Sequence, residues 1–275
     1  MILRENYFSA TRINWNDKAQ NIIELAKELN ISLDSMVFID DDPTNRALIK
    51  AILPEVETPD LPSDPSKYAS FLNSLDYFNS SVTTDEDKMR GNLYVTERLR
   101  KEEEKTFNTK EEFLRNLSLE LKVFKDEDSC VPRLSQMTEK TNQFNINKQP
   151  LTEEEILNFI ESPNSHVYYA KLQDKFGDYG VIMLAIIDIE DDTWHIQSLL
   201  MSCRVFGREI EESFLSILQN DALKKNIKNI AIEFKETPKN TPAKEFINKH
   251  FINGLNEIPD KPYSPPWVTI IYENI

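Results

Sequence analysis

The sequence predicts a chain of two units: an α/β unit that carries part of a parallel sheet, then an α+β unit with a mixed sheet and helices on both faces. One observation is the apolar run Met36-Val37-Phe38-Ile39, which lies between two helical patterns and is typical of a buried parallel strand. Another is the order of patterns after residue 109: strand, two helices, three strands, a long helix, strand, helix and strand. We place the first unit at residues 1–80, a helical linker at 81–108 and the second unit at 109–275.

The charge balance excludes some classes of partner. With 32 Lys and Arg against 47 Asp and Glu, the formal net charge is −15, whereas nucleic acids and anionic membrane surfaces attract proteins with a positive field. The two cysteines, Cys130 and Cys203, have no paired spacing, and we expect reduced, buried thiols in a cytoplasmic protein. No stretch approaches the roughly 18 apolar residues of a membrane span, and no signal-peptide core is evident.

Two helices are expected to flank the strand of the first unit. Asp17 can cap the first helix, whose apolar residues form a single stripe. After the strand, Thr44 or Asn45 can cap a helix that reaches Lys50. The other elements expected in this unit are a short strand at 55–58, an extended proline-rich link at 59–65 and a helix at 66–75.

Three carboxylates follow the predicted strand, in Asp40-Asp41-Asp42-Pro43. Open α/β sheets bind their ligands at such strand ends, and a hard cation such as Mg²⁺ would relieve the repulsion between adjacent carboxylates. The alternative is an ordinary charged loop, because acidic turns are common. Lys18 also has two interpretations. It stands in the first turn of a helix, an unfavourable place for a cation, so it is either a solvated surface residue or held there to meet an anion.

This stretch resembles the second half of the haloacid dehalogenase-like phosphatase core, through Lys18, the acidic strand end and the helix between them. The resemblance implies that Lys18 neutralises a phosphoryl group and that Asp40 and Asp41 hold Mg²⁺. The superfamily's nucleophile is an aspartate in an Asp-x-Asp pair after an earlier strand, and no such pair precedes Lys18. We therefore expect the Mg²⁺ site to need a further segment, and this unit not to hydrolyse phosphate alone.

The second unit is expected to begin with a short helix at 109–116 and a strand at 119–123, where apolar and charged residues alternate. The remaining elements expected, in chain order, are helices at 130–144 and 151–160, strands at 167–172, 179–189 and 193–201, an amphipathic helix after residue 209, a strand at 230–234, a helix at 241–250 with Pro242 in its first turn, and a strand at 267–272.

The order of these elements resembles the GNAT acyltransferase fold, and so does the turn Arg204-Val205-Phe206-Gly207-Arg208-Glu209 before the long helix. Members of that family bind the pyrophosphate or pantetheine of acyl-CoA in this turn, with the pattern Gln/Arg-x-x-Gly-x-Gly/Ala. Free amides at a helix start attract anions, and glycine allows their close approach. Glu209 departs from the pattern, because it removes one glycine and adds negative charge beside the anion.

Three further stretches make nearly the whole chain similar to the FkbH-like family, which fuses a phosphatase-like domain of haloacid dehalogenase subfamily IIIC to a GNAT-like domain. They are Lys140-Thr141-Asn142-Gln143-Phe144-Asn145, Phe176-Gly177-Asp178-Tyr179-Gly180 and Thr237-Pro238-Lys239-Asn240. The resemblance implies a transferase of polyketide biosynthesis that loads a glyceryl or acyl unit from a phosphorylated three-carbon donor onto the thiol of an acyl carrier protein, with loss of phosphate. It covers only the C-terminal portion of the family's architecture, so a separate chain is one expected source of the nucleophile.

The resemblance also implies which residues meet the carrier's phosphopantetheine arm or acyl-CoA, in a tunnel where the sheet opens beside the turn. These residues are Arg204, Gly207, Arg208, Asn142, Lys239 and Asn240. From the residues alone, surface ion pairs remain the alternative for the two arginines and a structural hydrogen bond for Asn142.

A further departure from the family pattern keeps other functions open. GNAT enzymes often carry a tyrosine acid where this chain has Ile247, and such a donor is worth roughly 10²–10⁴ in rate. The three histidines form no ligand motif, so a structural role is expected for them. The alternatives are a non-enzymatic module that docks a carrier protein or another partner, and an ordinary acyl-CoA-dependent GNAT acyltransferase.

Overall fold

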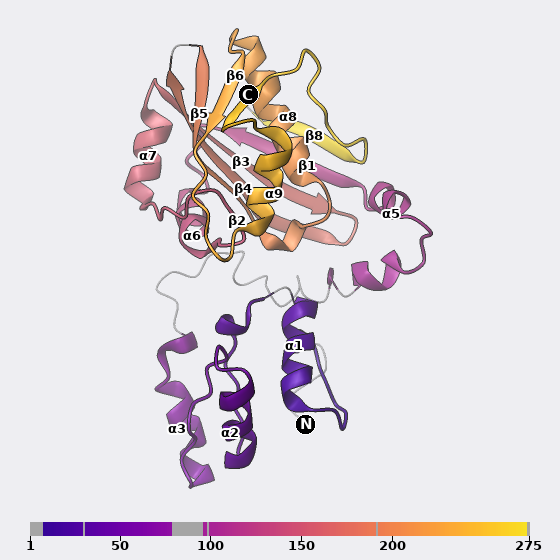
Figure 1. Ribbon diagram of the computed structural model, residues 1–275, viewed down its shortest axis with the longest axis vertical. Helices are drawn as coiled ribbons and strands as arrows, with labels where there is room; N and C mark the ends of the chain where they lie inside the picture. Colours follow the sequence, from indigo (N-terminus) through magenta and orange to yellow (C-terminus); the bar gives the residue numbers. More distant parts are fainter. Residues whose placement is uncertain (1–7, 30, 79–95, 98, 191, 274–275) are drawn as a thin grey trace. The chain divides into compact units, whose positions relative to one another are not determined.

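The computed structural model describes residues 8–29, 31–78, 96–97, 99–190 and 192–273. The chain divides into two compact units, Met1–Val95 and Thr96–Ile275. Figure 1 colours the first unit indigo to purple and the second magenta to yellow. The division falls inside the linker predicted at 81–108, and the last part of that linker belongs to the second unit. The helix cap predicted at Thr83-Thr84-Asp85 lies outside the described residues.

The first unit consists of helices around one short parallel contact. Its elements are α1 (Lys18–Leu29), η2 (Leu33–Ser35), α2 (Pro43–Ile52), η3 (Pro65–Lys67), α3 (Tyr68–Asn73) and η4 (Asp76–Phe78). As predicted, Asp17 caps α1, because its Oδ1 accepts from the amides of Ala19 (2.8 Å) and Gln20 (3.1 Å). The apolar stripe of α1 packs against α2 in a small core formed by Ala19, Ile22, Ile49, Leu53 and Val56.

The prediction of a fully buried strand at 36–39 is wrong. Val37 and Glu57 form an isolated parallel bridge, in which the Phe38 amide donates to the Glu57 carbonyl oxygen at 2.8 Å. Ile39 is 39% exposed. Among the described residues of this unit, no strand lies along the other edge of 36–39, so the segment is extended without a ladder.

The helix after the carboxylates begins earlier than predicted. Asp42, rather than Thr44 or Asn45, is the N-cap of α2, and its Oδ1 accepts from the Thr44 amide at 2.8 Å. Pro43 takes the first helical position, where a missing amide costs no intrahelical hydrogen bond. The helix therefore uses one of the three carboxylates, and Asp40 and Asp41 remain as candidates for chemistry.

The second unit is built on one mixed sheet, which confirms the predicted fold class. Its strands are β1 (Leu119–Lys125), β2 (Phe144–Asn145), β3 (Ser165–Asp174), β4 (Gly177–Glu190), β5 (Thr193–Met201), β6 (Asn229–Ile232), β7 (Leu255–Glu257) and β8 (Val268–Glu273). They lie in the order β7-β6-β5-β4-β3-β1-β8, with β2 also paired to β5. β5 and β6 are parallel, as are β1 and β8, whereas the neighbours from β1 through β3 and β4 to β5 are antiparallel. This is the arrangement expected from the GNAT-like order of elements.

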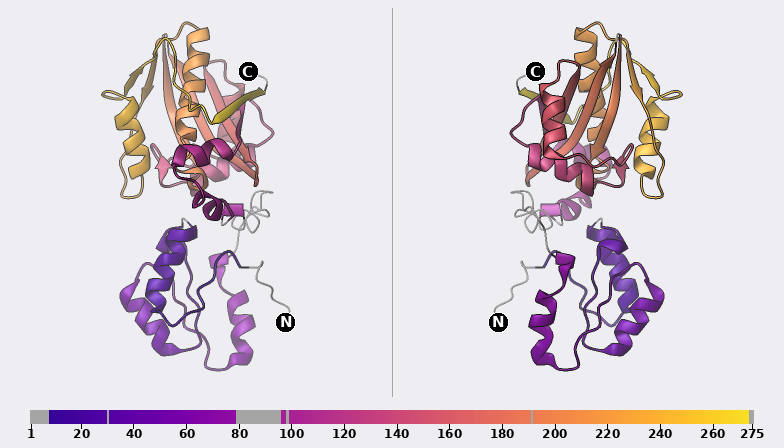
Figure 2. Two further views of the ribbon diagram at one scale, coloured as in Figure 1. Left: turned by 90° about the vertical axis from the view of Figure 1, so that its right-hand side faces the viewer. Right: turned by 90° about the vertical axis from the view of Figure 1, so that its left-hand side faces the viewer.

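Helices cover both faces of this sheet, as predicted (Figure 2). They are α5 (Lys110–Asn116), α6 (Val131–Lys140), α7 (Glu153–Glu161), α8 (Ile210–Lys224) and α9 (Thr241–His250). One core joins apolar residues of α5, α8 and α9 to the sheet, and a second core joins α6 and α7 to the other face. Tyr168 belongs to the first core and Tyr169 to the second, because successive strand residues point to opposite faces. In the described part of the chain, every helix is too short or too polar to cross a lipid bilayer.

Two elements of the second unit differ from the prediction. The helix expected at 130–144 ends at Lys140, because Thr141 is extended and β2 then pairs with β5. β7 has only three residues, too few to give a strand pattern in the sequence. Gly254 precedes β7 with φ +78°, and a Cβ there would lie 2.7 Å from the Ile232 carbonyl oxygen, so the close approach of β7 to β6 requires glycine.

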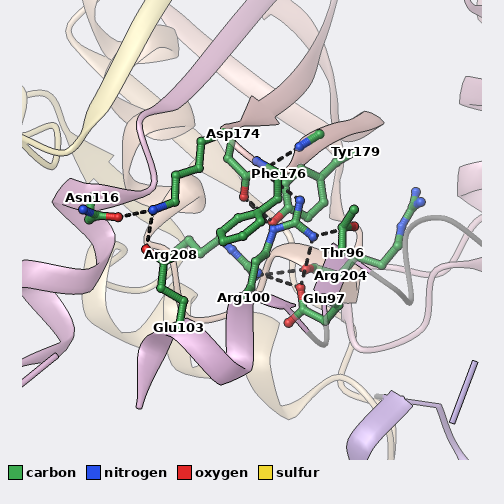
Figure 3. A network of polar contacts seen from close by, with 12 residues as sticks. Thr96, Glu97, Arg100, Glu103, Asn116, Asp174, Phe176, Tyr179, Arg204 and Arg208 are labelled. Carbon is green, nitrogen blue, oxygen red and sulfur yellow. Dashed lines mark hydrogen bonds and ion pairs between the residues drawn. The ribbon is translucent and has the colours of Figure 1, made fainter. Parts of the chain in front are cut away.

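A buried ion pair holds the end of the predicted linker to the second unit (Figure 3). Arg100, in the helical stretch at 99–104, contacts Asp174 through Nε (2.6 Å) and Nη2 (2.8 Å), and the two side chains are 2% and 0% exposed. The ring of Tyr179 lies close to the guanidinium groups of both Arg100 (4.3 Å) and Arg208 (5.3 Å). Burial acts to raise the pKa of Asp174, but hydrogen bonds from Arg100 hold it below its usual value. This stretch is therefore packed into the second unit rather than acting as a free connector.

Replacing Arg100 with methionine is expected to destabilise the second unit by about 3–5 kcal/mol, because the Asp174 carboxylate stays buried without its cation. The free energy of unfolding is measured by urea titration with tryptophan fluorescence. A Trp15→Phe background confines that signal to the second unit, which contains Trp194 and Trp267.

The matched control is Arg115→Met. It removes an exposed i,i+4 pair with Glu111, whose atoms are 2.8 Å apart, and is expected to cost less than about 1 kcal/mol. Equal decreases in the free energy of unfolding of the two variants would contradict a stabilising role for the buried pair.

Candidate functional site

Lys18 and Asp40 form an ion pair in the first unit. Lys18 Nζ lies 2.5 Å from Asp40 Oδ2. The Lys18 side chain is 47% exposed, whereas the Asp40 side chain is 9% exposed. The carboxylate offsets the unfavourable position of a cation at the start of α1. A half-exposed ammonium group held by a fixed carboxylate can also meet an incoming anion.

Asn45 and Arg46, which the sequence analysis did not assign to the site, support this pair. Asp40 Oδ1 accepts from the Asp42 amide at 2.9 Å and from Asn45 Nδ2 at 3.3 Å. Arg46 is buried, and its Nη1 donates to the carbonyl oxygens of Asp40 (2.7 Å) and Asp41 (3.0 Å). The backbone that presents the carboxylates is thus fixed by side chains of α2.

These contacts set the charge of Asp40. Burial acts to raise the pKa of Asp40, but hydrogen bonds from Lys18, the Asp42 amide and Asn45 outweigh it and hold the pKa below its usual value. Asp40 is therefore an anion at neutral pH. Because the pKa is lowered in the folded state, the pair contributes stability above the ordinary carboxyl pKa and loses it as the pH falls through the lowered value.

Asp40 and Asp41 can supply part of a Mg²⁺ site. Mg²⁺ prefers carboxylate oxygens and usually keeps several waters and phosphate oxygens in its octahedral shell. Within the described residues, no group of three or more His, Cys, Asp or Glu side chains is arranged to hold a metal. Both oxygens of Asp40 already have protein partners. The two carboxylates therefore offer at most part of the shell that Mg²⁺ needs, and waters or phosphate oxygens would have to supply the rest.

The turn predicted to bind a pyrophosphate connects β5 to α8. Gly207 has φ +77°, and a Cβ there would lie 3.4 Å from Lys110 Nζ, so a lysine of α5 stands beside the turn. The helix start itself is acidic, since Glu209 is the N-cap and Glu211 and Glu212 lie in the first turn of α8. Burial, with repulsion from the other two carboxylates, raises the pKa of Glu211. These groups compete with a ligand anion for the positive end of the helix.

Arg208 is bound within the protein (Figure 3). Its Nη1 donates to the carbonyl oxygens of Arg204 (3.0 Å) and Phe206 (3.3 Å), and its Nη2 donates to Glu97 Oε2 at 3.0 Å. Arg208 is only 7% exposed. The alternative that the sequence left open was a surface ion pair, whereas the arginine that pairs with Glu97 is buried. Arg204 Nε donates to Ser202 Oγ at 3.1 Å.

β5 and β6 part near this turn, and β2 lies in the opening. β6 pairs with β5 only as far as Ile196 and Ile232, and β5 then pairs with β2. The Ile146 amide donates to the Leu199 carbonyl oxygen at 3.3 Å, and its own carbonyl oxygen accepts from the Lys235 amide at 2.8 Å. A segment of backbone therefore occupies the place where the tunnel for the carrier arm is expected.

Asn240, expected to contact the cofactor, fastens this segment. It is 1% exposed. Its Nδ2 donates to the carbonyl oxygens of Asn145 (3.0 Å) and Lys235 (2.9 Å), and its Oδ1 accepts from the Thr237 amide at 2.8 Å. The side-chain amide of Asn240 is therefore used to join β2 to the loop after β6.

Asn142 and Lys239 are exposed, and Ile247, where a tyrosine acid is expected, is buried against the core. The histidines lie on separate elements, with His166 on β3, His195 on β5 and His250 on α9.

Comparisons with known proteins find partial similarities. No family model matches the chain, and a search of curated proteins finds no match. Among solved structures, the N-terminal part of the protein BF1531 from Bacteroides fragilis, which contains a phosphatase domain complexed with Mg, is 37% identical with a TM-score of 0.29. That similarity covers 30% of this chain and 22% of the Bacteroides chain.

Two N-acetyltransferases are also similar. The ribosomal-protein-S18-alanine N-acetyltransferase from Escherichia coli is 10% identical with a TM-score of 0.38, over 52% of this chain and 99% of its own. The PaiA N-acetyltransferase from Thermoplasma acidophilum, in complex with coenzyme A, is 12% identical with a TM-score of 0.39, over 50% and 98%. With all three TM-scores below 0.5, these likenesses assign no activity to this chain.

Replacing Lys18 with glutamine is expected to raise the pKa of Asp40, since a main group that lowers it is lost while burial remains. The measurement is an NMR pH titration of the Asp40 carboxyl carbon. Lys50→Gln is the matched control, because it removes the exposed Lys50–Asp60 pair (2.9 Å) of the same unit and leaves the contacts of Asp40 intact. An unchanged Asp40 titration in Lys18→Gln would show that the pair does not form in solution.

Proposed function

We propose that this protein takes part in moving an acyl or glyceryl unit from a phosphorylated three-carbon donor to the thiol of an acyl carrier protein, with release of phosphate. The observation that carries the proposal is the 2.5 Å contact between Lys18 Nζ and Asp40 Oδ2. It places a half-exposed cation and a fixed carboxylate together, and a phosphate ester with its Mg²⁺ needs both kinds of group.

In this proposal the first unit receives the donor's phosphate. Lys18 pairs with the phosphate oxygens, while Asn45 and Arg46 keep the carboxylate turn in place. Asp40 and Asp41 would hold Mg²⁺, which would supply positive charge beside the donor's phosphate. Phosphoryl transfer through a covalent intermediate also needs a nucleophile, and no Asp-x-Asp pair precedes Lys18 to supply one.

The second unit receives the carrier protein's phosphopantetheine arm, or acyl-CoA, near the turn at 204–209. Arg204 and Lys110 bring positive charge to this turn, which favours a phosphate-bearing arm. Glu209 and Glu211 oppose it. The arm also has to compete with β2 for the opening beside β5.

A non-enzymatic docking module is the second candidate, and two observations favour it. Arg208 and Asn240 already make hydrogen bonds inside the protein, and β2 fills the opening between the parted strands. A surface that only docks a carrier protein needs neither a free arginine nor an open tunnel.

One reconstitution distinguishes these functions. The protein is mixed with holo carrier protein, Mg²⁺ and a phosphorylated three-carbon donor, with and without a segment that carries an Asp-x-Asp nucleophile, and the carrier is weighed by mass spectrometry. Loading only with the added segment supports transfer. Carrier binding without loading in either mixture supports docking. Turnover of acetyl-CoA by this chain alone supports an ordinary acyl-CoA-dependent enzyme.

In the reconstituted reaction, Lys18→Gln is expected to slow carrier loading by roughly 10²–10³-fold, as is typical when one group that stabilises developing charge is removed. Asp40→Asn is expected to weaken Mg²⁺ binding, so that the Mg²⁺ concentration needed for half the maximal loading rate rises. The control Lys50→Gln is expected to load the carrier at the unchanged rate. Full activity of Lys18→Gln would exclude a phosphate-binding role for this lysine.

A further inference from the structure

A second cluster of charged side chains lies at the C-terminal end of α8, and the function proposed above uses none of them. α8 has 15 residues, so this cluster is about 22 Å from the turn at the start of the helix. Its members come from the end of β1, from β3 and from the end of α8. They are Lys125, Asp126, His166, Asp221 and Lys225.

Three of these residues form a line of hydrogen bonds. Lys225 Nζ lies 2.7 Å from His166 Nε2, and His166 Nδ1 lies 2.7 Å from Asp126 Oδ2. The other oxygen of Asp126 accepts from the Val167 amide at 2.7 Å, which fixes the carboxylate. Because a carboxylate can only accept, a neutral His166 carries its proton on Nδ1, and its Nε2 is an acceptor that faces the lysine.

Lys225 also has a cationic neighbour. Lys125 Nζ contacts Asp221 Oδ2 at 2.8 Å and lies within reach of Lys225. Burial, together with Lys125, lowers the pKa of Lys225. Asp221 and Asp126 act in the opposite direction but are outweighed. At a given pH, more of this side chain is therefore free amine than in an isolated lysine.

Aromatic rings lie beside the amine. The ring of Trp194 lies 5.8 Å from Lys225 Nζ and 5.8 Å from the ring of His166, and the Tyr168 ring lies 6.0 Å from His166. Trp194 is fully buried, and its Nε1 has no hydrogen-bond partner among the described residues. The cluster thus combines a nucleophile, a proton acceptor and a carboxylate that orients the acceptor.

We propose that Lys225 is a site of covalent acylation by acyl phosphates, whose negative charge suits the neighbouring Lys125 ammonium group, with His166 as the proton acceptor and Asp126 as the residue that positions His166. The ammonium group first gives one proton through His166 Nε2 to water. Nζ then bonds to the acyl carbon, the bond from that carbon to the phosphate oxygen breaks, and phosphate leaves with the electron pair. The second proton leaves Nζ by the same path, and a neutral amide remains.

The test compares Lys225 with its neighbour Lys224, whose side chain is 64% exposed. The whole protein is incubated with acetyl phosphate or with acetyl-CoA across a pH series, and acetylation of each lysine is quantified by mass spectrometry after cleavage at acidic residues. With acetyl phosphate, Lys225 is expected to react at least about tenfold faster than Lys224, and to reach half its maximal rate at a lower pH. Faster reaction with acetyl-CoA instead would assign the site to thioesters and overturn the stated donor.

His166→Gln is expected to bring Lys225 down to the rate of Lys224, while Lys224 itself does not change. Asp126→Asn is expected to lower the Lys225 rate by a smaller factor, because His166 remains. Circular dichroism checks that each variant is folded. If His166→Gln does not fold, the Lys125→Met variant is measured instead. Removal of this neighbouring cation is expected to shift the pH dependence of Lys225 acetylation to higher pH, and an unchanged pH dependence would contradict the proposal. Equal rates for the two lysines in the unmodified protein would overturn the proposal.

Discussion

The ion pair between Arg100 and Asp174 is the constraint on which the rest of the second unit depends. Asp174 accepts two hydrogen bonds from the guanidinium group, and its Oδ1 also accepts from the amides of Phe176 and Gly177, which fixes the connection between β3 and β4. Tyr179, whose ring contacts both Arg100 and Arg208, extends the same network to the turn before α8. One buried charge pair therefore contacts three parts of the unit directly or through Tyr179. They are the helical stretch at 99–104, the β3–β4 connection and the turn at 204–209. Because the cost of burying charge is recovered only with good geometry, loss of either partner is expected to weaken the packing of these parts together.

Local patterns account for much of the predicted fold. Asp17 and the box formed by Thr152 and Glu155 cap their helices through contacts within three residues, so the signal lies in the sequence itself. The long strands β3 to β5 also follow their patterns, because each spans nine residues or more. β2 and β7 were not predicted, because they have only two and three residues. They form by pairing with strands that are distant in the sequence, so they leave no local pattern.

The candidate site divides in the same way. Lys18 could be singled out because a cation at a helix start is unfavourable, and Asp40 because it follows an apolar run. Arg46 could not, although it shares the buried face of α2 with Ile49, since a charged residue on such a face carries no sign of the carbonyl groups it will meet. The roles expected for Arg208 and Asn240 were inferred from motifs, whereas each also makes one hydrogen bond to a residue far away in the sequence, Glu97 and Asn145 respectively.

The two-residue strand β2 has a kinetic consequence for anything that enters beside β5. A ligand that uses the backbone groups of Leu200 and Met201 finds them already engaged by Asn145 and Phe144. Such a ligand can bind only those protein molecules in which β2 is displaced from β5. The observed dissociation constant therefore equals the intrinsic one divided by the fraction of the protein in that open state. Association is then gated by the opening of the segment, and its observed rate levels off as the ligand concentration rises.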